Sequence, residues 1–241
     1  MNRIIKSEHL KTRHTFIRPA LFLFPLLTIT LSVFLLGGNL VQVSAYNWWY
    51  VLILPAVFLI ICISVMQNDR KLDFYNLRLL PLSQTSLYFG KIIIICFYLC
   101  LTNLFLFLAS LILGFLFGRQ FDWYVGLGAS IILTLTYMWQ IPLCILSIKK
   151  AGTAITFVIA LLLNSIMSSQ PIAASKAWMI PYAIPSRLMS PIIKVNPSGV
   201  PLSDKSLLND RGVIIPGIFI SLFMFFITTW IMNRQLSKDE R

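Results

Sequence analysis

The chain has 241 residues, of which 58% are hydrophobic and only 12% are charged, and its formal net charge is +12. A soluble domain of this size carries about 25% charged and about 45–50% apolar residues, so the composition excludes an ordinary soluble protein. The excess apolar surface has to face lipid, and the sequence therefore predicts an integral membrane protein.

Six long runs without Asp, Glu, Lys, Arg or His follow one another along the chain. They cover residues 20–38, 48–66, 92–118, 123–148, 151–175 and 212–233. About 20 apolar residues cross a bilayer core as a helix, and a charge at mid-span costs roughly 2.5–3.5 kcal/mol. Because the runs are continuous rather than alternating, helices are favoured over a closed barrel. We expect an all-α polytopic membrane protein with about six transmembrane helices.

Two of these runs need a closer reading. The first is followed by Val43-Ser44-Ala45, which resembles a signal-peptide cleavage site, but its length and long basic leader favour an uncleaved first span. The fifth run carries Asn164, Ser165, Ser168, Ser169 and Gln170 in its second half. We expect its helix to end near these polar residues.

The positive charges predict the orientation. If both ends of the chain are cytoplasmic, the inner segments are 1–18, 67–91, 149–150 and 234–241, and the outer segments are 39–47, 119–122 and 171–212. The inner segments hold 14 of the 20 Lys and Arg residues, although the two sets are nearly equal in length. Cytoplasmic loops are enriched in Lys and Arg, so both termini are expected in the cytoplasm. The same charge indicates attraction to anionic lipid and not nucleic-acid binding.

The residues offer no catalytic, metal-binding or cofactor-binding constellation. The two histidines, His9 and His14, are five apart in the basic leader, and no apolar run contains an acid or a base of the kind that marks a proton relay. Gly90-Lys91 lacks the preceding glycine and the following Ser or Thr of a phosphate-binding loop. We expect no enzyme activity and no bound cofactor. A permease whose ATP is hydrolysed by a separate subunit fits this inventory.

The chain is interpreted as one transmembrane domain, 1–241, with three notable segments outside the spans. The leader, 1–18, fits equally a helix at the cytoplasmic interface or a plain basic leader. The inner segment 67–91 places Leu72, Tyr75 and Leu79 at i, i+3 and i+7, which predicts an apolar stripe on a short helix ending at Pro81. This segment is interpreted as a docking surface, and the alternative is a loop resting on the membrane.

The third segment, 171–212, is the outer loop. Its six prolines forbid a long continuous helix. Its interspersed apolar residues indicate short interfacial or re-entrant pieces, with Trp178 suited to the headgroup layer. Asn196-Pro197-Ser198-Gly199 is typical of a turn.

Two stretches of this layout resemble a known family. One is Tyr75-Asn76-Leu77-Arg78-Leu79-Leu80-Pro81-Leu82-Ser83, followed by Tyr88 and Gly90-Lys91. The other is Pro185-Ser186-Arg187-Leu188-Met189 with Pro191, then Asn196-Pro197-Ser198-Gly199-Val200-Pro201-Leu202. Together they resemble the type-2 ABC exporter permeases, and in particular the permease subunits of lantibiotic self-immunity transporters of the epidermin and mutacin type. The first stretch fits many exporter permeases, and the second narrows the resemblance.

The resemblance implies partners and a cargo that the composition does not. An ABC ATPase subunit would bind the segment 67–91, a second homologous permease would complete the pore, and ATP hydrolysis would expel a lantibiotic peptide from the membrane to protect the producing cell. The expected coupling residues are Leu72, Tyr75, Asn76, Leu77, Leu79 and Pro81. The candidate cargo contacts in the outer loop are Trp178, Arg187, Asn196 and Gly199. The alternatives are an ABC permease for another lipophilic peptide or a lipid, and a non-transporting membrane scaffold.

Overall fold

The computed structural model describes residues 2–12, 15–36, 38, 40–71 and 84–239, and in these residues every regular element is helical. The long helices are α2 (Ile17–Leu36), α4 (Leu54–Lys71), α6 (Gln84–Phe117), α7 (Trp123–Tyr137), α8 (Gln140–Lys150), α9 (Thr153–Met167) and α12 (Ile214–Asp239). The short elements are α1 (Asn2–Lys11), α3 (Val41–Trp48), η1 (Trp49–Ile53), α10 (Gln170–Ala174), η2 (Lys176–Met179), α11 (Ile184–Ile193), η3 (Leu207–Asn209) and η4 (Arg211–Val213). The predicted all-α class is confirmed.

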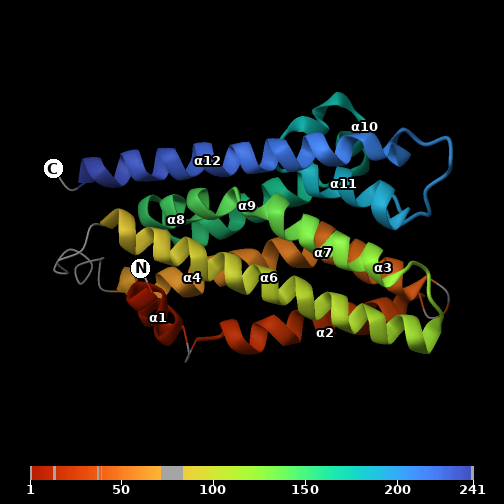
Figure 1. Cartoon of the computed structure of the whole chain (residues 1–241), viewed down its shortest axis with the longest axis horizontal. Coiled ribbons are helices and arrows are strands. Elements are labelled where there is room, and N and C mark those ends of the chain that lie inside the picture. The colour runs from red at the N-terminus through yellow and green to blue at the C-terminus, as the bar shows by residue number, and fades with distance from the viewer. Residues whose placement is uncertain (1, 13–14, 37, 39, 72–83, 240–241) are drawn as a thin grey trace.

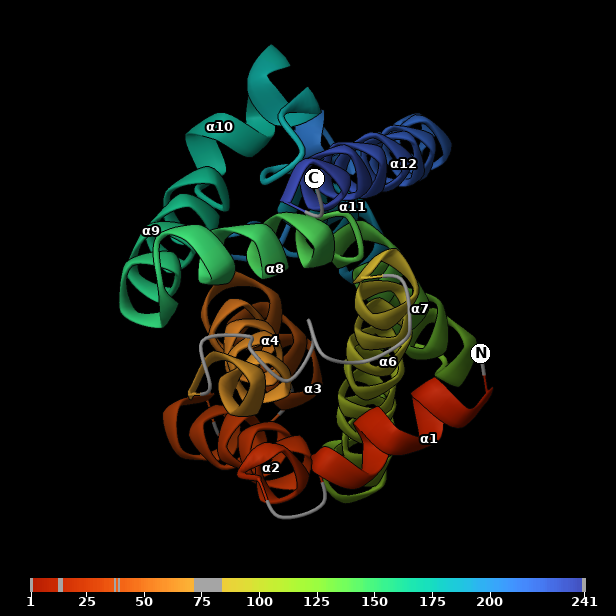
Figure 2. The same cartoon turned by 90° about the vertical axis from the view of Figure 1, so that its left-hand side faces the viewer.

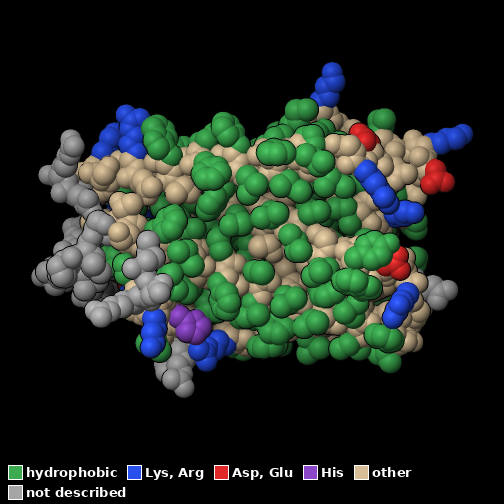
Figure 3. Space-filling view, viewed as in Figure 1, with side chains coloured by type: hydrophobic (Ala, Val, Ile, Leu, Met, Phe, Trp, Pro, Cys, Tyr) green, Lys and Arg blue, Asp and Glu red, His purple; other side chains and the backbone are tan. Residues whose placement is uncertain are grey.

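The long helices run side by side along the length of the molecule (Figure 1). Four helical stretches are long and apolar enough to cross a bilayer, namely 17–36, 41–67, 84–117 and 211–238, and the bent pair α7 and α8 makes a fifth. The remaining predicted run forms α9, which is apolar but has only 15 residues. A broad band of hydrophobic side chains covers the middle of the face in Figure 3, and basic side chains lie at its two ends. The acidic side chains visible in this view lie toward the right-hand end. This distribution suits a bundle that spans a bilayer.

Both termini lie at the same end of the bundle, as the charge distribution predicts (Figure 1). This end also carries the last turn of α4, the first turn of α6 and the α8–α9 connection, and we refer to it as the inner end. The segments α10, η2 and α11 lie toward the opposite, outer end. In the view onto the inner end, α1 lies across the bundle from the side of α6 toward the start of α2 (Figure 2). Residues Asn2–Lys11 of the leader form a helix.

The polar patch 39–47, expected as an outer connection, mostly belongs to the second span. The stretch α3, η1 and α4 is continuous, and its middle is a turn of π-helix. Gln42, Tyr46 and Asn47 are tolerated there because their side chains are buried and have hydrogen-bond partners. Gln42 donates from Nε2 to the carbonyl of Ser110 (3.1 Å) and accepts from the backbone N–H of Gln120 (3.1 Å). A polar residue in a helix thus marks a satisfied interior position and not the end of the span.

The fourth span is broken between α7 and α8, whose axes meet at 42°. The break is held from two sides. The hydroxyl of Thr228 on α12 donates to the carbonyl of Trp139 (3.0 Å), and the amides of Gln140 and Asn164 donate to each other across α8 and α9 (3.1 and 3.0 Å). Helix α9 ends at Met167, among the polar residues where the sequence predicted its end. The short α9 is therefore fixed to the broken span by a buried pair of amides.

Removing one amide of this pair should cost more than removing both. In Asn164→Leu the buried amide of Gln140 loses its partner, and an unsatisfied buried polar group costs about 1–3 kcal/mol. The double variant Gln140→Leu/Asn164→Leu leaves no unpaired amide. We expect Asn164→Leu to lower the unfolding temperature of the purified protein in detergent, and the double variant to recover most of the loss. If the double variant loses more stability than the two single variants lose together, this pairing is contradicted.

Candidate functional site

Four charged side chains meet at the inner end, and three of them are buried. The ammonium of Lys91 on α6 binds Glu8 of α1 (2.7 Å) and Asp69 of α4, and these three side chains are almost completely shielded from solvent. Half-buried Lys11 completes the group by binding Glu8 (2.7 Å) and Asp69 (3.4 Å). We call Glu8, Lys11, Asp69 and Lys91 the inner ion cluster. Two carboxylates and two ammonium groups make it electrically neutral.

Neutrality and pairing are what allow these charges to be buried. Removing a charge from water costs several kcal/mol, and close opposite charges with additional hydrogen bonds offset this cost. For Lys11, burial opposes the charged form, but the hydrogen bonds and negative charges of Glu8 and Asp69 outweigh it and raise its pKa above the ordinary value. These charges can therefore stay buried only as long as they remain paired with one another. The inner ion cluster links α1, α4 and α6.

Two further contacts fasten α1 to α6. Gly90 allows the close approach, because a Cβ at this position would lie 2.7 Å from Cγ2 of Ile4. Two turns further along the same face of α6, the hydroxyl of Tyr98 lies 2.7 Å from the hydroxyl of Thr12 and 3.1 Å from Nδ1 of His9. Helix α1 is thus attached at its start by packing and toward its end by ion pairs and hydrogen bonds.

The inner ion cluster brackets the expected docking segment. Asp69 lies in the last turn of α4 and Lys91 in the second turn of α6, so the two residues stand at the two ends of the segment that connects these helices. The expected coupling residues Leu72, Tyr75, Asn76, Leu77, Leu79 and Pro81 lie outside the residues that the structure describes. What the structure shows is that both ends of their segment are fixed to α1 and to each other.

Sequence reasoning did not identify the inner ion cluster. Gly90-Lys91 stood out only as part of a motif, and neither Glu8 nor the role of Asp69 was identified. A usable signal was present, because Lys91 directly precedes an apolar run and Asp69 follows another by three residues. Opposite charges at the adjoining ends of two consecutive spans can meet at one membrane face. The contribution of Glu8 depends on where α1 lies, which local pattern does not reveal.

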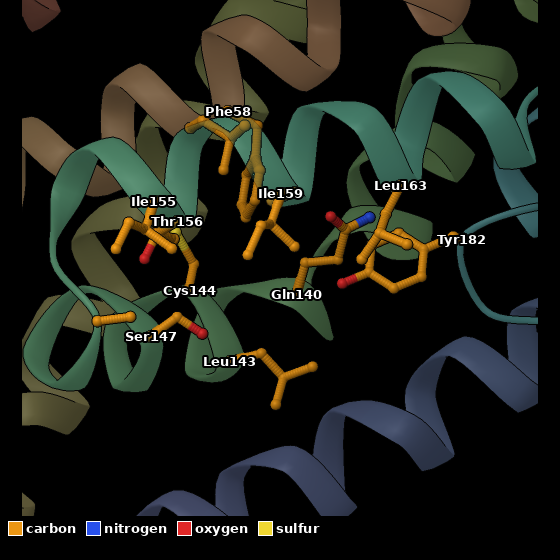
Figure 4. Close-up of a pocket in the computed structure, with 13 residues that line it drawn as sticks. Phe58, Gln140, Leu143, Cys144, Ser147, Ile155, Thr156, Ile159, Leu163 and Tyr182 are labelled. Atoms are coloured by element: carbon orange, nitrogen blue, oxygen red, sulfur yellow. The ribbon is translucent and has the colours of Figure 1, made fainter.

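Figure 4 shows a charge-free pocket. It measures about 230 Å³ and is lined by α4, α8, α9 and Tyr182. Ile155, Ile159 and Leu163 of α9 face α8 across the pocket. Its polar groups are uncharged, and the hydroxyl of Thr156 is buried without a hydrogen-bond partner among the described residues. The pocket suits an apolar segment that carries an uncharged hydrogen-bonding group.

The outer loop forms the short helical pieces that its prolines predict, and α11 is buried against α7 and α12. Arg187 of α11 is buried and donates from its two Nη atoms to the carbonyls of Leu208 (2.9 Å) and Leu207 (2.8 Å). Close packing on α12 supports this arrangement, since a Cβ at Gly217 would lie 2.8 Å from a methyl carbon of Leu188. Arg187 thereby holds the end of the outer loop on α11.

A second cavity, of about 620 Å³, opens between the outer loop and the outer ends of α2 and α3. One wall is the turn 196–199, which is closed by a hydrogen bond from the N–H of Gly199 to the carbonyl of Asn196 (2.8 Å). Gly199 has φ = +86°, a conformation that favours glycine. The side chain of Asn47 on α3 donates to the carbonyl of Asn196 (3.0 Å) and docks the turn on the bundle. We call this space the outer cavity, and its lining is mostly apolar.

The structure brings two of the four candidate cargo contacts together. Asn196 and Gly199 lie in the same turn, and Gly199 lines the outer cavity. Trp178 instead packs, half-buried, with the apolar cluster of Ile184, Leu188 and Val213. Arg187 is engaged by backbone carbonyls. Among the described residues, no group of three or more His, Cys, Asp or Glu side chains is arranged to hold a metal ion.

A bundle of long apolar helices, with ion pairs at one end and apolar cavities along its length, has the features of a membrane transport subunit. Residues 4–170 match the family described as ABC-2 family transporter protein, which is more than half of the chain, and the protein belongs to this family. It is accordingly a multi-pass permease subunit of an ABC transporter in the cytoplasmic membrane, and an ABC ATPase is its partner by family membership. No curated protein and no solved structure matches the chain. The family match includes α1 and the inner ion cluster and ends where the outer loop begins.

Removing Lys91 should destabilise the protein strongly. In Lys91→Met two carboxylates stay buried with only the half-buried Lys11 beside them, and breaking a buried pair in this way costs about 3–5 kcal/mol. We expect a lower unfolding temperature and less folded protein in the membrane. Lys205→Met, which removes one exposed lysine from the outer loop, is the matched control. Equal stability of the two variants would show that the buried pairing contributes nothing.

The contact between Gly90 and Ile4 can be tested by compensation. Gly90→Val should push α1 away from α6, because even the first added carbon collides with Ile4. Hydrogen exchange of the α1 amides should then become faster. Adding Ile4→Ala should slow the exchange again, since the smaller side chain makes room. If exchange in α1 is the same in Gly90→Val and in the unchanged protein, the close approach is not what holds α1.

Proposed function

We propose that this permease works with an ABC ATPase and a second, homologous permease to expel a lantibiotic peptide from the cytoplasmic membrane, and so gives the producing cell self-immunity. The supporting observation is the outer cavity. Its wall contains the turn 196–199, which belongs to the stretch that resembles the immunity permeases. It lies at the outer end, where a peptide inserted into the outer leaflet would be met, and its apolar lining suits such a cargo.

We infer further that the ATPase docks on the segment 67–91 through Leu72, Tyr75, Asn76, Leu77, Leu79 and Pro81. The support is the position of the inner ion cluster, which fixes both ends of this segment to α1. A segment fixed in this way passes a displacement on to α4 and α6 instead of absorbing it. ATP is bound by the partner subunit, and the permease itself needs no cofactor.

Another lipophilic peptide or a lipid is the nearest alternative cargo. The charge-free pocket between α4, α8 and α9 would accept an apolar segment of any of these molecules. A non-transporting scaffold is the alternative of another class, and it would bind an ATPase without moving a cargo. A transport assay distinguishes a scaffold from a permease. The identity of the transported cargo distinguishes a lantibiotic permease from a permease for another lipophilic peptide or a lipid.

The docking surface is tested by changing Leu72, Tyr75 and Leu79 together to Asp. Charges on the apolar stripe should prevent burial against the ATPase, so we expect the ATPase to be lost from a pull-down with the tagged permease. The matched control changes Met179, Val200 and Leu207, three exposed apolar residues of the outer loop, to Asp. Retention of the ATPase by the stripe variant, at normal membrane insertion, would refute the docking assignment.

The cargo is tested by survival of a sensitive host that expresses the permease with its partner subunits. Asn196→Ala should reduce tolerance of the transported lantibiotic at unchanged expression, since the turn is held through the backbone carbonyl of Asn196 and not through its side chain. Trp178→Ala should also reduce tolerance, but it removes packing against Ile184 and Leu188 of α11 as well. Arg187→Ala should reduce expression as well, because the buried carbonyl of Leu208 loses its donor at a cost of about 1–3 kcal/mol and the bond to the carbonyl of Leu207 is lost with it. Survival that is the same with and without the intact permease, for every lantibiotic tried, would refute the proposed cargo while leaving the ABC permease assignment intact.

A further inference from the structure

A groove of about 410 Å³ lies between α1 and α6 at the inner end, away from the cavities described above. Ile5, Lys6 and His9 of α1 form one wall, and Ile93, Ile94 and Phe97 of α6 form the other. Four of the six lining side chains are apolar. The two polar ones are a lysine and a histidine, and no carboxylate lines the groove.

Because of the inner ion cluster, the groove is lined by basic side chains and by no acidic one. The only acidic residue of α1, Glu8, is turned inward and is neutralised by Lys91 and Lys11. Lys6 is exposed on the opposite side, at the groove. At the groove, α1 therefore presents positive charge without a neighbouring acid from its own helix.

Exposed apolar side chains on one face of α6 extend from the groove toward the middle of the bundle. Phe97 lines the groove and is 52% exposed. The exposed residues Leu104 and Leu108 follow on the same helical face, seven and eleven positions further along. A molecule with a negative group at Lys6 and an alkyl chain would find a partner for each part, because α1 lies across the end of α6 (Figure 2).

We propose that this groove binds an anionic phospholipid of the cytoplasmic leaflet. The phosphate lies beside Lys6 and His9, and one acyl chain runs past Ile94 and Phe97 onto α6. The anionic headgroup is favoured because basic sites at the cytoplasmic surface attract acidic lipid, at about 1 kcal/mol per basic residue. Since His9 also contacts Tyr98, the bound lipid supports the attachment of α1 to α6.

The test uses the purified full chain in a neutral detergent, titrated with phosphatidylglycerol or phosphatidylcholine, with bound lipid measured by native mass spectrometry. We expect tighter binding of phosphatidylglycerol and a larger rise in the unfolding temperature. Lys6→Gln should weaken phosphatidylglycerol binding about fivefold, the factor expected for one basic residue. Binding should also weaken as salt is raised, because exposed charges are screened. Equal binding of the two lipids would overturn the proposal.

Three controls keep the result specific. Lys205→Gln removes an exposed lysine from the outer loop and should leave lipid binding unchanged. Phe97→Ala keeps the charge but removes part of the wall for the chain, and should weaken binding of both lipids. Inorganic phosphate at the same concentration should not stabilise the protein. An equal effect of Lys6→Gln and Lys205→Gln, a Phe97→Ala variant that binds as the unchanged protein does, or stabilisation by phosphate alone would each contradict a lipid site in this groove.

Discussion

Burial of Lys91 between Glu8 and Asp69 is the constraint on which the inner half of the structure depends. A lysine ammonium in this position requires two carboxylates from two other helices, and it therefore determines where α1 lies and how the ends of α4 and α6 face each other. Gly90 and Tyr98 complete the attachment, one by leaving space and the other by hydrogen bonding. The last turn of α4 and the start of α6 are consequently held together and to α1.

The polar interactions that hold the helices together differ between the inner end, the middle and the outer end of the bundle. Ion pairs hold the inner end, paired amides such as Gln140 and Asn164 hold the middle, and bonds to backbone carbonyls hold the outer loop at Arg187 and Asn47. Neutral pairs suit the hydrocarbon region, where a charge is costly. The described cavities follow the same order, because a charge-free pocket lies in the bundle and the outer cavity lies where α2 and α3 end.

The sequence predicted the elements whose signal is local and missed those that depend on contacts between distant residues. Charge-free runs identified the long helices, the polar residues after Asn164 marked the end of α9, and the prolines predicted a broken outer loop. The patch 39–47 was expected to lie outside the helices because it is polar. The prediction was wrong because Gln42 and Asn47 have interior partners about 70 and 150 positions away, which local sequence does not reveal. The inner ion cluster was missed for the same reason, since Glu8 and Lys91 are 83 residues apart. The stripe at Leu72, Tyr75 and Leu79 and the cargo contacts stay predictions.

The central claim is that the inner ion cluster transmits the motion of the ATPase to the spans. The most direct measurement is the amount of cargo moved per ATP hydrolysed by the reconstituted transporter, comparing the unchanged permease with Glu8→Gln/Asp69→Asn/Lys91→Met. This variant removes both carboxylates together with the buried lysine, so it leaves no carboxylate without a partner. The account predicts that ATP hydrolysis continues while the cargo moved per ATP falls several-fold. The same ratio in both proteins would contradict it.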